Sequence, residues 1–177
     1  MKVFILKPDA NRYQGLLPAD RSNSLEVFHR FNGSPFGSSW DPWKVEIDRA
    51  EGYENLPFGD FPGMASHVPV FTERAVALLE PLLSGNGELL PLVCDEGSYF
   101  AYNVTSVLDA LDVGRSSVLR FTDGGIMNIT RHEFFPEKVT SPIFKIPQTP
   151  LMDVFVTEEF QAAVSKHDLK GFLFKPA

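Results

Sequence analysis

The order of strand-like and helix-like segments limits most strongly what this chain can fold into. Short apolar or alternating runs follow one another, whereas only two segments have the pattern of a good helix. The regular strand–helix–strand alternation of a doubly wound parallel sheet is absent. We therefore predict an α+β fold with a mostly antiparallel sheet, two main helices and a loop-rich N-terminal region. The 177 residues are expected to form a single domain, 1–177, with one core.

The clearest helix is predicted over 73–84. Thr72 is a suitable N-cap, Glu73 lies in the first turn, where the helix dipole favours negative charge, and Gly85 supplies a stop. Pro81 removes a backbone donor and is expected to kink the helix or end it early. Apolar residues recur at three- and four-residue spacing and predict one buried stripe, made of Ala75, Val76, Leu79, Leu82 and Leu83.

The other expected elements are shorter. Residues 2–7 have the apolar run of a buried strand, and 43–48 alternate as a half-exposed strand does. Residues 8–40 are predicted to be mostly loop, and a second helix, 158–166, follows Thr157 as its cap. Further strands are expected at 88–94, 99–104, 117–122, 126–130, 143–146, 152–156 and 171–175.

The turn at 123–125 allows two registers. A two-residue loop would place Leu119 opposite Asn128 and mix polar with apolar side chains on one face. A three-residue loop would pair Phe121 with Met127 and Leu119 with Ile129, which makes one face fully apolar. We therefore predict the three-residue loop, with Gly125 in the left-handed conformation that such hairpins need.

The net charge of -7 is distributed unevenly. Residues 41–112 hold thirteen acidic and three basic side chains, a net charge of -10. Such a charge repels nucleic acid and anionic membranes and attracts a basic partner protein. The alternative is a solvated acidic face that only keeps the protein soluble.

Compartment signals are few. The opening Met1–Pro8 has too short an apolar run for a signal peptide, and no stretch approaches the about 18 apolar residues of a membrane span. Cys94 is the only cysteine, so an internal disulfide is impossible. We expect a cytoplasmic location.

No catalytic motif is visible in the sequence. The chain has neither a G-x-S-x-G nucleophile elbow nor a phosphate-binding P-loop, and Cys94 ends an apolar strand where a packed thiol is common. We expect no metal, no cofactor and no enzymatic activity. An enzyme whose active site is assembled from scattered residues remains the alternative. Metal sites usually have closely spaced ligand pairs, unlike the four separated histidines, His29, His67, His132 and His167.

The loop-rich segment 36–61 is the most unusual feature, because aromatic and acidic residues are interleaved in it. Aromatic side chains supply contact area at protein interfaces, and an acidic rim selects a basic partner. The alternative is that the rings, Trp40, Trp43, Tyr53, Phe58 and Phe61, fold down as a lid on the sheet. The predicted partner-binding residues are Trp40, Asp41, Trp43, Glu46, Asp48, Glu51, Glu54 and Asp60.

An ordered set of segments from residue 71 onward carries a family resemblance. The segments are Phe71–Val76, Gly87–Leu92, Tyr102–Thr105, Leu108–Asp112, Phe144–Pro147 and Val156–Phe174. Together they resemble a family of immunity proteins from bacterial polymorphic toxin systems, formerly a domain of unknown function. Residues 1–70 match that family poorly beyond the first strand and the tryptophan-containing strand.

The resemblance implies a non-enzymatic protein, encoded beside a toxin, that protects the producing cell by binding that toxin. It carries over no functional residue. We expect partner specificity to reside in residues 1–70, which also contain the acidic aromatic segment, and the toxin to present a basic surface. A scaffold or homodimer without a toxin partner is a further alternative.

Overall fold

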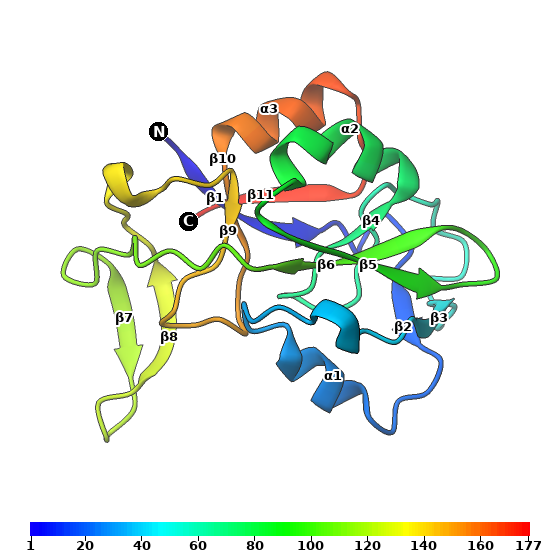
Figure 1. Ribbon diagram of the computed structural model, residues 1–177, viewed down its shortest axis with the longest axis horizontal. Coiled ribbons are helices and arrows are strands. Elements are labelled where there is room, and N and C mark those ends of the chain that lie inside the picture. Colours follow the sequence, from blue (N-terminus) through cyan, green and yellow to red (C-terminus); the bar gives the residue numbers. More distant parts are fainter.

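The computed structural model describes all residues, 1–177, and confirms the α+β prediction (Figure 1). The first sheet has four antiparallel strands in the order β11 (Phe172–Pro176), β1 (Val3–Pro8), β10 (Phe155–Thr157) and β9 (Ile143–Phe144). The second has the order β2 (Leu16–Pro18), β3 (Trp43–Ile47), β5 (Gly87–Val93), β6 (Tyr99–Val104) and β4 (Val70–Thr72), with only β3 and β5 parallel. A separate hairpin joins β7 (Ser117–Arg120) to β8 (Ile126–Arg131).

Three α-helices and two short 3-10 turns complete the chain. The helices are α1 (Ser24–Arg30), α2 (Glu73–Leu83) and α3 (Glu158–Lys166), and the turns are η1 (Gly37–Ser39) and η2 (Pro136–Lys138). Helices α2 and α3 lie side by side over one face of the four-stranded sheet (Figure 1). The buried apolar residues fall into three clusters instead of the single core that we expected from chain length.

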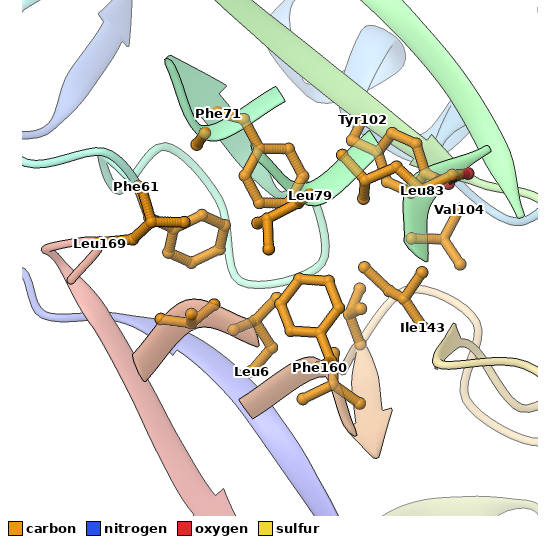
Figure 2. Close-up of a cluster of buried hydrophobic side chains, with 14 residues drawn as sticks. Leu6, Phe61, Phe71, Leu79, Leu83, Tyr102, Val104, Ile143, Phe160 and Leu169 are labelled. Atoms are coloured by element: carbon orange, nitrogen blue, oxygen red, sulfur yellow. Dashed lines mark hydrogen bonds between the residues drawn. The ribbon is translucent and has the colours of Figure 1, made fainter. Parts of the chain in front are cut away.

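The largest cluster lies between α2, α3 and both main sheets. Figure 2 shows Leu79 of α2 and Phe160 of α3 pointing into it together with Leu6 of β1 and Tyr102 of β6. Leu79 is fully buried, as the predicted stripe required, and Leu82 packs at the margin of the cluster. The alternation of burial along α2 therefore follows the apolar spacing of the sequence.

The end of α2 differs from the expectation. Pro81 does not end the helix early, because α2 continues to Leu83 before Gly85 stops it with a φ of +77°. Two side chains satisfy the last carbonyls, which have no partner within the helix. Asn86 Nδ2 donates to Leu82 O at 3.0 Å, and the Tyr102 hydroxyl donates to Leu83 O at 2.5 Å.

The two predicted N-caps have opposite outcomes. Thr72 Oγ1 accepts a bond from Ala75 N at 3.3 Å, which confirms it as the cap of α2. Thr157 makes no side-chain bond at the start of α3, and its hydroxyl is buried without a partner. The residue before β1 replaces the cap, since Glu158 N donates to Lys2 O at 3.2 Å.

The second cluster joins α1 to the sheet edge formed by β2 and β3, and it includes Leu16, Phe31 and Val45. Strand β2 lies in the region predicted as mostly loop. It is only three residues long and ends at a proline, so it is too short to show a period-2 pattern. Cys94 packs against this cluster, as predicted for a structural thiol.

The C-terminal end of α1 is held by two basic side chains from elsewhere in the chain. His67 Nε2 lies 2.9 Å from Phe28 O, and the fully buried Lys145 donates from Nζ to Phe31 O. The Lys145 ammonium supplies the positive charge that this end of a helix favours, whereas burial lowers the pKa of His67, which contributes a hydrogen bond. These contacts attach α1 to the rest of the molecule, although none of the residues of α1 itself is buried.

The hairpin differs from the predicted register. Leu119 pairs with Asn128, Arg120 pairs with Ile126, and the register shifts twice along the two strands. Gly124, with φ +91°, holds the left-handed position that was assigned to Gly125. The prediction assumed that one face of the hairpin would be buried, whereas Leu119 and Phe121 are about half exposed. The buried face is the opposite one, where Val118 pairs with Ile129 against the third cluster, so burial does not select an apolar partner for Leu119.

Candidate partner-binding surface

Strand β3 supplies the first part of the surface. Val45 and Ile47 are 2% and 5% exposed and point into the second cluster, whereas Glu46 between them points to solvent. The expected half-exposed strand is therefore confirmed. Asp48 follows at the end of the strand and is half-buried, with its Oδ1 accepting a bond from Ala50 N at 3.0 Å.

Parallel pairing of β3 with β5 brings a second pair of acids to the same place. Lys44 pairs with Val93, so the residues that follow both strands leave the sheet at the same edge. Asp95 and Glu96, in the exposed turn after β5, thereby come close to Glu46 and Asp48. These four acids line a hollow of about 490 Å³ together with two arginines. Its charged lining residues are Arg21, Glu46, Asp48, Arg49, Asp95 and Glu96.

One of these arginines is already paired. Both terminal nitrogens of Arg49 contact the carboxylate of Glu96, one of them at 3.4 Å. Glu51 and Glu54 extend the negative charge along the exposed turn that follows. We call the set Glu46, Asp48, Glu51, Glu54, Asp95 and Glu96 the acidic surface.

Both tryptophans pack down onto the sheet, as the alternative interpretation held. The Trp40 ring packs edge-on against the Phe36 ring, with 5.1 Å between the ring centroids, and Trp40 Nε1 donates to Pro91 O at 3.0 Å. The centroids of the Trp43 and Phe28 rings lie 5.2 Å apart. Each side chain is half-buried against the second cluster, so the two rings stabilise the domain and expose only part of their surface.

Two other aromatic side chains of the segment are exposed instead. Phe58 is 57% and Tyr53 is 39% exposed, whereas Phe61 is buried in the first cluster. Tyr53 lines a second hollow of about 460 Å³ with Leu17, Met64 and Leu173. This apolar hollow adjoins the acidic one, because Leu17 and Asp48 line both. No pattern in the sequence distinguishes the exposed rings from the buried ones.

Asp60 is a correction to the predicted set. It is only 8% exposed, and its Oδ2 accepts bonds from Arg74 Nη1 and Lys170 N, both at 2.8 Å. A buried carboxylate with these partners tethers the start of α2 to the last turn of the chain, and it is not part of an exposed rim. Asp41 is exposed but precedes β3, so it lies at the opposite end of the strand from Asp48.

A third hollow, of about 810 Å³, lies where the two ends of the chain meet, beside β1 and α3 (Figure 1). The His132 ring in its wall is 6% exposed and packs between Phe134 and Phe155, and its Nδ1 has no hydrogen-bond partner. Burial lowers the pKa of His132. The nearby Glu133 carboxylate lies 3.8 Å from Arg115, so histidine and carboxylate do not form a hydrogen-bonded acid–base pair here.

The structure contains neither a cluster of potential metal ligands nor a helix suited to span a membrane. No group of three or more His, Cys, Asp or Glu side chains is placed to hold a metal ion. None of the helices has the length and apolar character needed to cross a bilayer.

No family model matches the chain, and no curated protein matches it.

Proposed function

We propose that this chain is a non-enzymatic binding protein that neutralises a cognate bacterial toxin, and that it contacts the toxin through the acidic surface. The observation that carries the proposal is the gathering of exposed acids from two separate segments around one hollow, next to exposed aromatic rings. The resemblance of residues 71–177 to immunity proteins supplies the kind of partner.

The chemistry of the surface supports a protein partner with basic side chains. Five of its six acids are exposed, and the excess of negative charge accelerates encounter with a positive surface; the exposed ones are Glu46, Glu51, Glu54, Asp95 and Glu96. Tyr53 and Phe58 offer apolar contact area beside those charges. Aromatic residues of this kind dominate the binding energy of many protein interfaces. We therefore assign the anchor role to these two rings instead of to Trp40 and Trp43.

The test is the binding kinetics of the purified chain with the protein encoded by the neighbouring gene. We expect a one-to-one complex in which Glu46→Lys, Glu51→Lys and Glu54→Lys together lower the association rate at least about tenfold at low salt. Tyr53→Ala and Phe58→Ala should mainly raise the dissociation rate, because they remove packed contacts.

The control is a triple variant with the same change of charge elsewhere, Glu26→Lys, Glu80→Lys and Glu137→Lys, all at exposed positions. It should associate close to the wild-type rate if location matters, and thermal melting should show that both triple variants fold. Equal slowing by both would reduce the effect to net charge. If no complex with the neighbouring gene product forms, the enzyme alternative takes first place.

A further inference from the structure

The β7–β8 hairpin presents an apolar face to solvent. Leu119, Phe121 and Met127 are 51%, 52% and 45% exposed, whereas the opposite face of the hairpin packs against the third cluster. Leu119 lies in β7, and Phe121 directly follows the last residue of that strand, Arg120. Met127 occupies the unpaired position of a bulge, because Leu119 pairs with Asn128 and the next ladder pair skips one residue. We call these three side chains the hairpin face.

The charges around the hairpin face have the opposite sign to those of the acidic surface. Residues 113–131 hold three exposed arginines and one acid, Asp123, a net charge of +2 in a chain of net charge -7. Arg115 is paired with Glu133 at 3.8 Å, so Arg120 and Arg131 are the arginines without a carboxylate partner. Figure 1 places the hairpin at one end of the longest axis and strands β2 and β3 at the other. The molecule therefore has a positive apolar end and a negative hollowed end.

The shapes of the two ends are also complementary. The hairpin projects from the body, whereas the apolar hollow around Tyr53, Leu17 and Leu173 opens beside the acidic hollow around Glu46 and Asp48. We call these two adjoining hollows the socket. A projecting apolar group can fill the first hollow while neighbouring arginines reach the carboxylates of the second.

The charges of the socket fix which part of the hairpin enters which hollow. Lys7 and Lys175 lie in the wall of the apolar hollow, and Lys7 is paired with Asp153 at 2.7 Å. Asp48 also lines that hollow, so its charges nearly balance, and its apolar wall of Leu17, Met64 and Leu173 suits the uncharged Phe121 ring. The acidic hollow has an excess of carboxylates over arginines and is the place for Arg120.

We propose that the hairpin face of one copy docks into the socket of a second copy, so that the protein associates head to tail. This contact is heterologous: each copy in a pair still has one free hairpin or one free socket, and chains of copies can grow. The inference does not depend on the proposed function. Because both proposals use the acidic surface, a toxin bound there would compete with the second copy.

The experiment measures sedimentation velocity of the full chain over a range of concentrations. The hairpin variant carries Arg120→Glu and Phe121→Ser, and the socket variant carries Glu46→Lys and Tyr53→Ser. We expect the wild type to associate with rising concentration and each variant alone to associate at least about tenfold more weakly. An equimolar mixture of the two variants should form a one-to-one dimer and nothing larger, because one intact hairpin meets one intact socket.

A matched control, Leu25→Ser with Glu26→Lys on the exposed face of α1, should associate as the wild type does. Formation of the one-to-one dimer in the mixture also shows that both variants are folded. A wild type that stays monomeric overturns the proposal, and so does a mixture that stays monomeric. A socket variant that dimerises by itself would assign the hairpin face to a symmetric contact. Binding of a monomeric wild type, but not of the hairpin variant, to anionic phosphatidylserine vesicles would assign that face to a lipid surface.

Discussion

Helix α2 and the β7–β8 hairpin both carry large apolar side chains in a regular pattern, but they are surrounded differently. Leu79 of α2 is completely buried between the two main sheets and α3, whereas Leu119 of the hairpin is half exposed. The apolar spacing correctly identified the buried side of the helix. In the hairpin the same reasoning led to the wrong register, because nothing covers the face that the pattern was assumed to bury.

The largest expected effect tests this difference directly. Leu79→Ala should cost roughly 2–5 kcal/mol of unfolding free energy, because it leaves a cavity in a closely packed cluster. Leu119→Ala should change stability by no more than about 0.5 kcal/mol, as surface substitutions usually do. Urea denaturation of both variants checks the pair. Similar losses for the two would show that the hairpin is covered in solution, and the second-copy contact would then be the first explanation to examine.

The comparison extends to charged groups, since Lys145 is fully buried and Arg120 of the hairpin is exposed. Burial lowers the pKa of Lys145 from 10.5 to about 8. Between pH 8 and about 10 the unfolded chain keeps a proton that the folded chain releases, so stability should rise with pH. The slope cannot exceed about 1.4 kcal/mol per pH unit. Lys145→Met should abolish this rise, and the exposed control Lys138→Met should keep it.

The rise should end near pH 10, because a second buried group has the opposite effect. Burial raises the pKa of Tyr102 above its ordinary value of 10.0. Above that pH the folded chain holds the phenol proton that the unfolded chain loses, so stability should fall. Denaturation midpoints measured from pH 7 to 11 would reveal the maximum. A flat profile in the wild type would mean that Lys145 is better solvated than its burial indicates.

The smallest effect concerns the turn of the hairpin. Gly124→Ala forces a side chain into a conformation with φ +91° and should cost about 1–2 kcal/mol locally, whereas Gly125→Ala should cost much less. Phe121 N donates to Gly125 O at 2.8 Å across this turn. Hydrogen exchange at the Phe121 amide should therefore accelerate about tenfold in the first variant only. Faster exchange in Gly125→Ala instead would favour the register that the sequence predicted.

Local patterns predicted much of the fold. The limits of α2 followed from Thr72 and Gly85, and the half-exposed β3 followed from its alternating residues, because each signal acts within one element. Strand β2 was missed since its three residues are too few to show a period. The replacement of the Thr157 cap by Lys2 O could not be foreseen, because the two residues are far apart in the sequence and meet only through strand pairing.

The candidate site was predicted in part for the same reason. Glu46 and Asp48 were recognisable from β3, whereas Asp95 and Glu96 join them only because β3 and β5 pair in parallel. Sequence alone gives the density of charge but not its placement. Asp60 belongs to the same acidic segment as its neighbours, yet it is buried and accepts hydrogen bonds from Arg74 and Lys170.

Strand β1 lies inside the four-stranded sheet, between β10 and β11. Its residues therefore find both neighbours near the other end of the chain, for example Phe4 with Val156 and Pro176. During synthesis β1 leaves the ribosome before its two neighbours and stays without them until residues 155–176 have followed. Contacts so distant in sequence slow folding and prolong the exposure of unpaired strands. A cell that makes this protein thus obtains the finished sheet only after residues 155–176 have been translated, and nascent chains that end before them are the natural clients of chaperones.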